Sequence, residues 1–188
     1  MAGVRRNRVD LPYRVVLRAV LPEDVPAVCE LLRETWLHAY ATMIPRWNID
    51  HFITGYADWE RVLSTPGLYT GMLVCAELDG VLVGVVQAEP TDKRGTSAIW
   101  LLYVRPAYQG LGIGCALLRA VYQRFNDAKS YRLEVLMQNR NAIAFYKSRG
   151  FSISSVSITK LGLVPTFFMT RSGSELFMVW KPALARTA

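Results

Sequence analysis

The stretch "VRPAYQGLGIGCALL", residues 104–118, decides how the rest of this sequence is interpreted. It leaves an apolar segment, passes a proline, places glycines at positions 110, 112 and 114, and continues with the apolar spacing of a helix. Glycines remove the side chains that would keep a ligand from the backbone. A helix N-terminus offers unpaired N–H donors and a partial positive charge. The stretch therefore predicts a strand-to-helix loop that holds an anion, most naturally a phosphate or pyrophosphate.

Two known phosphate-binding motifs fit this loop poorly. No Gly-Lys-Ser/Thr follows, so the lysine and hydroxyl with which a P-loop binds phosphates and magnesium are missing. The dinucleotide fingerprint has GxGxxG spacing and an acidic residue about twenty positions on, whereas the glycines here are spaced GxGxG. A plain tight turn, with glycines present for packing, stays open as the alternative.

Length and composition favour one globular domain. The chain has 188 residues, of which 52% are hydrophobic and 20% charged. This length allows a sizeable core, and no apolar run reaches the roughly 18 residues of a membrane span. We expect an N-terminal tail over residues 1–14, a single domain over residues 15–182 and a C-terminal tail over residues 183–188. The first ten residues contain three arginines but no apolar signal segment, which predicts a cytoplasmic protein.

Charge, cysteines and histidines narrow the classes of ligand. The net charge of +7 favours an anionic partner, but the basic residues are scattered, so a small ligand is expected rather than nucleic acid or a membrane. Cys29, Cys75 and Cys115 lie far apart in apolar stretches, which favours buried thiols over disulfides or a metal site. His38 and His51 have no cysteine partner at zinc-ligand spacing. No metal is expected.

Apolar periodicity predicts alternating strands and helices. The clearest signal is a hairpin over residues 72–87, because Asp79-Gly80 supplies the positive φ angles of a tight two-residue turn. Further strands are expected over residues 15–20, 98–104, 131–137, 153–159 and 175–180, and helices over residues 25–36, 49–63, 113–125 and 139–150. This order predicts an α/β protein with one mixed sheet and helices on its faces.

At this point two motifs resemble those of the GNAT N-acetyltransferase superfamily. The segment from Gln109 to Gly114 is similar to the family signature QxxGxG/A. A second segment, "NRNAIAFYKSRGF", matches the family pattern NxxAxxFYxxxGF at Asn139, Ala142, Phe145, Tyr146, Gly150 and Phe151. The resemblance covers residues 100–151 specifically. It implies the acyl-CoA N-acyltransferase fold, with about seven mostly antiparallel strands, about four helices, and a splay between the strands that end near residues 104 and 137.

The resemblance also implies acetyl-CoA as the acyl donor, a co-substrate whose pantetheine arm lies in the splay. The amides of Leu102 and Val104 would bind the arm and polarise the thioester, while the glycine loop grips the pyrophosphate. For Asn139 and Asn141, capping of the following helix is an equal alternative. The predicted coenzyme-binding residues are Leu102, Tyr103, Val104, Gln109, Gly110, Leu111, Gly112, Ile113, Gly114, Asn139, Asn141 and Tyr146.

The same resemblance assigns the chemistry. Tyr146 matches the position whose phenol protonates the departing thiolate, with aromatic packing as the alternative. Glu134 is the candidate general base, by analogy with family members that acetylate ribosomal-protein N-termini; a structural pair with Arg132 would explain it equally. Glu89 and an ordered water chain compete for the role of base.

The acceptor is the least determined part. Trp36, Tyr40 and Trp47 are predicted to line its pocket, together with the loops at residues 35–50 and 159–173. The resemblance implies direct transfer in a ternary complex to a primary amine, either a small molecule or a peptide N-terminus, and allows a homodimer. The alternative function is a non-catalytic or regulatory acyl-CoA-binding module.

Overall fold

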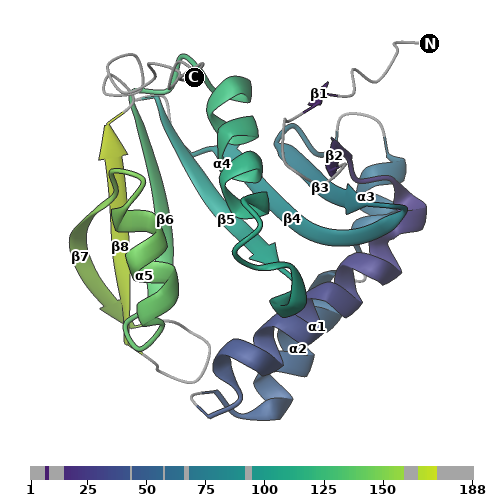
Figure 1. The fold of residues 1–188 in the computed structure, drawn as a ribbon, viewed down its shortest axis with the longest axis horizontal. Helices are drawn as coiled ribbons and strands as arrows, with labels where there is room; N and C mark the ends of the chain where they lie inside the picture. The colour runs from purple at the N-terminus through teal and green to yellow at the C-terminus, as the bar shows by residue number, and fades with distance from the viewer. Residues whose placement is uncertain are drawn as a thin grey trace, which may run out of the picture.

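The fold is built on one sheet, shown in Figure 1. The computed structural model describes residues 7–8, 15–42, 44–56, 58–65, 68–91, 95–158 and 165–172. Eight strands lie in the order β1-β2-β3-β4-β5-β6-β8-β7, and only the β5–β6 pair is parallel. Their bounds are β1 Asn7–Arg8, β2 Val15–Ala19, β3 Met72–Leu78, β4 Val81–Pro90, β5 Thr96–Val104, β6 Ser130–Leu136, β7 Ser152–Ile158 and β8 Pro165–Ser172. The mixed sheet confirms the predicted fold class.

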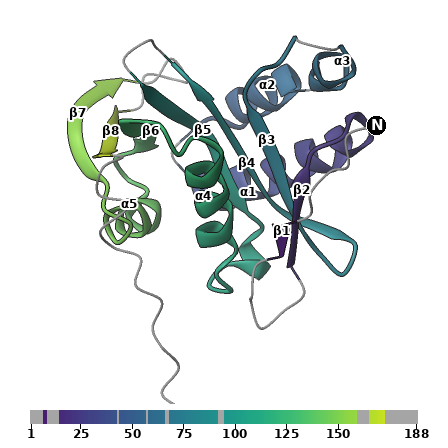
Figure 2. The same ribbon diagram turned by 90° about the horizontal axis from the view of Figure 1, so that it is seen from above.

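Helices cover both faces of this sheet, as Figure 2 shows from above. One core cluster joins the sheet to α4 and α5 through residues such as Leu117, Val121 and Tyr146. A second cluster joins the other face to α1 and α2 through Leu32 and Ile53. The helices are α1 Val25–Tyr40, α2 Arg46–Tyr56, α3 Trp59–Ser64, α4 Ile113–Arg124 and α5 Arg140–Lys147, with short 3₁₀ turns at Pro22–Asp24 and Pro106–Tyr108.

The β3–β4 hairpin forms at the predicted turn. Asp79 and Gly80 have φ angles of 50° and 83°, the left-handed conformation that a two-residue turn of this kind requires. Farther along β4, a Cβ on Gly84 would lie 3.0 Å from Leu117 and 3.2 Å from Ile113. Because glycine lacks that atom, α4 packs directly against β4, and this contact fixes where the glycine loop before α4 lies.

Two segments differ from the prediction. The helix expected over residues 49–63 is divided into α2 and α3. Both pieces pack on the same core cluster, which is why their apolar residues have the spacing of one helix. Residues 165–172, expected in a pocket loop, form β8 between β6 and β7. The strand predicted over residues 175–180 and the helix stop at Pro66-Gly67 lie outside the described residues. So does the predicted C-terminal tail.

Two residues of the predicted N-terminal tail lie in the sheet. Asn7 and Arg8, placed in the predicted N-terminal tail, pair with Leu17 and Val16 of β2. No helix in the described ranges has the length and hydropathy needed to span a membrane.

Candidate functional site

The central strands β5 and β6 separate as predicted. They pair only from Thr96–Ser130 to Ile99–Leu133, and both strands continue beyond the last pair. At the same point the β4–β5 register shifts: Gln87 pairs with Leu101 and Ala88 with Ile99, which leaves Trp100 as an extra residue. A bulge of this kind bends the strand that carries it. The separation of β5 from β6, visible in Figure 1, therefore begins where β5 is bulged.

The separation directs backbone groups of β5 into the gap. The Arg105 amide donates to the carbonyl of Val83 at 2.9 Å, so it faces β4. Along a strand the N–H groups alternate between its two edges. The amides of Leu102 and Val104 therefore face the other edge, past the last pair with β6. The Val104 carbonyl, on that edge, accepts a hydrogen bond from the Gln109 side chain at 3.1 Å.

A cavity of about 720 Å³ occupies this gap, and we call it the cleft cavity. It brings together all of the predicted coenzyme-binding residues except Leu111, namely Leu102, Tyr103, Val104, Gln109, Gly110, Gly112, Ile113, Gly114, Asn139, Asn141 and Tyr146. Arg140 and Arg149, which the sequence analysis did not single out, also line it. Two guanidinium groups add to the positive end of α4, so the cavity suits an anionic ligand.

The glycine loop owes its glycines to backbone conformation. Gly110 and Gly112 have φ angles of 80° and 83°, where other residues are strained. Gly112 is the N-cap of α4. A Cβ on Gly110 would meet nothing within 4 Å, so close packing does not explain that glycine. A Cβ on Gly114 would meet Phe145 at 3.5 Å, an ordinary contact, which agrees with the alanine that the family signature allows there.

Tyr146 is both packed and cavity-lining. It is 8% exposed, and its ring lies edge-on to Phe145 and Phe151 at centroid distances of 5.3 and 5.7 Å. Burial raises the pKa of the Tyr146 phenol well above its ordinary value, and the nearby Tyr40 and Tyr122 phenols raise it further. The phenol is therefore protonated at neutral pH, and it can donate a proton but not accept one.

Asn139 has a structural role. Its side-chain oxygen accepts a hydrogen bond from the Ala142 amide at 3.1 Å and caps α5, while its nitrogen donates to the Tyr40 hydroxyl at 3.1 Å. Burial raises the pKa of Tyr40, although hydrogen bonds with Asn139 and Tyr103 oppose the shift. The pair connects the C-terminal end of α1 to the start of α5. The Asn139 cap thus holds Tyr40 at the edge of the cleft cavity.

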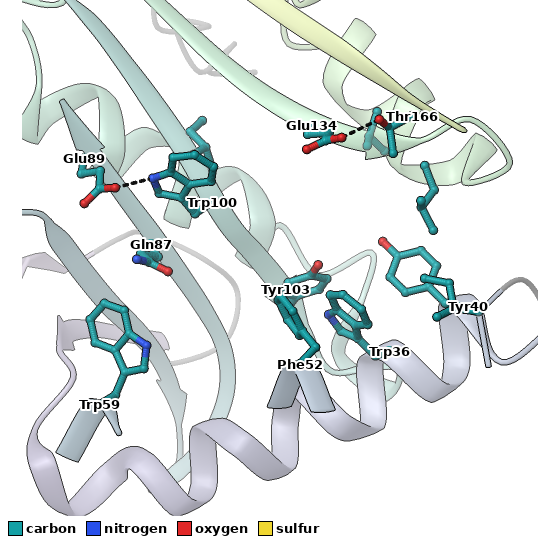
Figure 3. A pocket seen from close by; sticks show the side chains of 14 residues that line it. Trp36, Tyr40, Phe52, Trp59, Gln87, Glu89, Trp100, Tyr103, Glu134 and Thr166 are labelled. Atoms are coloured by element: carbon teal, nitrogen blue, oxygen red, sulfur yellow. Dashed lines mark hydrogen bonds between the residues drawn. The ribbon is translucent and has the colours of Figure 1, made fainter. Parts of the chain in front are cut away.

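A second cavity, of about 330 Å³, adjoins the first, and we call it the aromatic cavity (Figure 3). Trp36 stacks on Phe52 at a centroid distance of 4.0 Å and meets Tyr40 edge-on at 5.3 Å. Six residues line both cavities, so the two lie side by side: Tyr40, Ile99, Trp100, Tyr103, Glu134 and Val135.

Two carboxylates lie on the wall of the aromatic cavity, each held by a neutral donor. Glu89 accepts a hydrogen bond from the Trp100 indole at 2.7 Å, and Glu134 accepts one from the Thr166 hydroxyl at 2.5 Å. Neither forms an ion pair with a described residue, so the expected pair of Glu134 with Arg132 is not present. Glu134 lines both cavities, whereas Glu89 lines only the aromatic one.

The predicted acceptor residues are only partly brought together. Trp36 and Tyr40 line the aromatic cavity, but Trp47 is 70% exposed and lines neither cavity. It lies on the outer side of α2 because Ile49 and Ile53 turn the opposite side into the core. Gln87 and Trp100 were not predicted, whereas Thr166 belongs to the segment 159–173 that was expected to line the pocket. Phe52 and Trp59 lie within the predicted helix over residues 49–63, which was not expected to contribute to the pocket beyond residue 50. Gln87 could have been noticed in the sequence because it is a polar residue in the otherwise apolar run of β4.

The described residues contain no cluster of three His, Cys, Asp or Glu side chains that could bind a metal. The thiol of Cys75 is buried, those of Cys29 and Cys115 are partly buried, and all three are free. Arg149 donates a hydrogen bond to the Cys115 sulfur at 2.8 Å.

Comparison with known proteins agrees with this geometry. Mycothiol acetyltransferase from Sanguibacter keddieii is 30% identical over 108 residues, which cover 54% of this chain but only 34% of that protein. PaiA N-acetyltransferase from Thermoplasma acidophilum, solved in complex with coenzyme A, has a TM-score of 0.71 at 22% identity and covers 84% of this chain and 98% of its own. YncA from Salmonella typhimurium, solved with its cofactor acetyl-CoA, has a TM-score of 0.59 at 19% identity, with coverages of 84% and 93%.

The two solved structures show a shared fold, and the family profile extends the relation to sequence. The profile described as "Acetyltransferase (GNAT) family" matches residues 25–151, more than half of the chain. The match includes β5, the glycine loop, α4 and α5. This chain therefore belongs to the GNAT acetyltransferase family.

Proposed function

We propose that this protein is an N-acetyltransferase that moves an acetyl group from acetyl-CoA to a primary amine by direct attack in a ternary complex. The observation that carries the proposal is the end of β5–β6 pairing at Ile99–Leu133, after which the two strands border two adjoining cavities. Neighbouring structures that contain coenzyme A and acetyl-CoA support the donor. The acceptor is a small-molecule amine or a peptide N-terminus.

In this proposal the cleft cavity binds the donor. The pyrophosphate lies at the glycine loop, where the N-terminus of α4 supplies unpaired amides and Arg140 and Arg149 supply positive charge. The pantetheine arm follows the gap between β5 and β6. The amides of Leu102 and Val104 donate to the arm and to the acetyl carbonyl, which polarises the thioester.

The acceptor approaches from the aromatic cavity. An amine has to lose a proton before its lone pair can attack, and Glu134 accepts that proton because its carboxylate lies where the two cavities meet. The nitrogen attacks the carbonyl carbon, a C–N bond forms, and the C=O electron pair moves onto oxygen. The β5 amides stabilise this oxyanion without rearranging.

The tetrahedral intermediate then collapses. The C–S bond breaks, its electron pair stays on sulfur, and the thiolate takes the proton of the Tyr146 phenol. The nitrogen, which carries an extra proton after the attack, loses it to the Tyr146 oxygen and so restores the phenol. Burial, which raises the pKa of Tyr146, keeps that proton in place at neutral pH. Because a buried thiolate is poorly solvated, its protonation, together with the return of the nitrogen proton to Tyr146, leaves no unpaired charge in the cavity.

A turnover screen tests the proposal. Free thiol release is measured with acetyl-CoA against aminoglycosides, polyamines, amino acids and peptides, and coenzyme A binding is measured by calorimetry on the same sample. Turnover of any amine together with coenzyme binding supports the proposal. Binding without turnover across the panel would instead indicate a non-catalytic acyl-CoA-binding module. A folded protein that gives no heat with coenzyme A would refute both.

A further inference from the structure

The charges around the aromatic cavity restrict the acceptor. Its described lining includes the carboxylates of Glu89 and Glu134 but no Lys, Arg or His. A carboxylate or phosphate on the acceptor would lose its water there without gaining a counterion, and it would lie near two like charges. A protonated amine gains both carboxylates as partners. The cavity therefore favours an acceptor whose charged groups are all cationic.

The aromatic walls of the cavity restrict the size and the polarity of the acceptor. Six aromatic side chains surround the cavity: Trp36, Tyr40, Phe52, Trp59, Trp100 and Tyr103. Flat rings of this kind hold an apolar or aromatic body and attract a cation through their faces. The volume of about 330 Å³ is at the small end for ligand sites. The part of the acceptor that enters is therefore small and largely apolar.

One polar side chain on this wall is left without a partner. Gln87 of β4 is only 7% exposed, and its amide oxygen is buried with no hydrogen-bond partner among the residues that the structure describes. Figure 3 shows the side chain on the cavity wall, in the region of Trp59, Glu89 and Trp100. Nearly all buried polar groups are hydrogen-bonded, and an unpaired one carries a free-energy cost. A ligand in the cavity would supply the missing partner.

Trp36 of α1, which also lines this cavity, has a second unpartnered polar group. Trp36 is 5% exposed, and its indole N–H has no partner in the described ranges. The lining therefore has one unpaired acceptor, on Gln87, and one unpaired donor, on Trp36. A hydroxyl or a carboxamide both donates and accepts hydrogen bonds, so a neutral group of either kind can pair with the Gln87 oxygen.

Building on the proposed acetyl transfer, we infer that the acceptor is a small amine without a carboxylate, with an apolar or aromatic body and a neutral hydroxyl or carboxamide group, and that Gln87 determines specificity by hydrogen-bonding to that group. Gln87 lies on β4, which β5 separates from the coenzyme gap, and it does not line the cleft cavity. Its role is therefore in acceptor choice, separate from the binding of coenzyme A.

Four related amines test this inference with wild-type protein and acetyl-CoA. Phenethylamine is the parent, tyramine adds a distal hydroxyl, phenylalaninamide adds a carboxamide beside the amine, and phenylalanine replaces that carboxamide with a carboxylate. We expect kcat/KM for tyramine or phenylalaninamide to exceed that for phenethylamine by about 10-fold to 100-fold, because only they pair the buried groups. Phenylalanine should be the poorest of the four.

The variant Gln87→Met tests whether Gln87 recognises the acceptor or only supports the fold. The nearly isosteric change removes an unpaired buried polar group, so thermal stability should stay the same or rise. The ratio of kcat/KM between the polar amine and phenethylamine should fall to about 1, with coenzyme A affinity unchanged. Gln123→Met, the same substitution at an exposed position of α4, should change none of these quantities.

The outcomes distinguish this inference from the proposed function. Turnover of no amine at all would refute the proposed function. Turnover in which phenethylamine equals the polar amines, or phenylalanine equals phenylalaninamide, would overturn the inference and leave acetyl transfer standing. An unchanged ratio in Gln87→Met would overturn the role of Gln87. If that variant fails to fold, the wild-type ratios alone still decide the acceptor class.

Discussion

The cleft cavity and the aromatic cavity share a wall but are built in different ways. The cleft cavity depends on backbone groups of consecutive residues, from Leu102 on β5 to Gly114 at the start of α4. The aromatic cavity is made of side chains from α1, α2, α3, β4, β5, β6 and β8, which are distant in sequence. Their charges differ as well: Arg140 and Arg149 line only the first, and Glu89 only the second. A contiguous backbone site leaves a motif in the sequence, whereas a dispersed side-chain site leaves none.

The largest effect is expected at Tyr146, the residue to which the family motif assigns the proton donor. Tyr146→Phe removes the proton donor but keeps the packed ring, so we expect kcat to fall about 100-fold or more, with coenzyme A affinity unchanged. Steady-state kinetics and calorimetry measure the two effects. Tyr122→Phe is the matched control, because the Tyr122 hydroxyl bonds Arg171 outside both cavities. Wild-type kcat in Tyr146→Phe would remove the tyrosine from the mechanism.

Substituting the two carboxylates one at a time tests which of them accepts the proton of the amine. Glu134→Gln should lower kcat about 10-fold to 100-fold, because the amide cannot accept the amine proton. Glu89→Gln should cost less than about 10-fold and act mainly on KM, because Glu89 lies away from the coenzyme gap. The pair is compared under the same assay conditions. The opposite ranking would make Glu89 the base and move the reaction into the aromatic cavity.

Alanine substitutions at two glycines test whether the backbone conformation of the loop shapes the coenzyme site. Alanine is strained by roughly 1–2 kcal/mol in the left-handed conformation of Gly110. We expect Gly110→Ala to bind coenzyme A about tenfold more weakly. Gly114→Ala adds only an ordinary contact with Phe145 and should bind almost as wild type. Calorimetry with coenzyme A compares the two variants. Equal affinities would mean that the φ angle of Gly110 does not shape the coenzyme site.

The smallest effect is expected at Asn139, which caps α5 and connects it to Tyr40 of α1. Asn139→Ala loses the α5 cap and the hydrogen bond to Tyr40, at a cost of about 1 kcal/mol each. For a chain of this size the Tm should fall by about 4–8 °C. Asn141→Ala, at an exposed position of the same helix, should leave the Tm unchanged and weaken coenzyme A binding. A stable Asn139→Ala variant would return Asn139 to a coenzyme-binding role.

Much of the fold followed from local patterns, and the exceptions have physical causes. The Asp79-Gly80 turn, the apolar β5 strand and the capped α5 helix each depend on residues close in sequence. β8 was missed because turn-forming residues flank it, and its place between β6 and β7 depends on pairing over long distances. Trp47 was misplaced because apolar content does not tell which side of α2 faces the core.

The sequence alone determined the Asp79-Gly80 turn, the strand-to-helix loop and the family of this protein, because those features depend on residues within short segments. Only the tertiary structure decided that Thr166 of β8, rather than Arg132, holds Glu134, and that Trp36 and Gln87 face one cavity with unpaired polar groups. Side chains on distant segments meet only when the sheet and helices pack. Their contacts follow from that packing, and no local pattern in the chain encodes them.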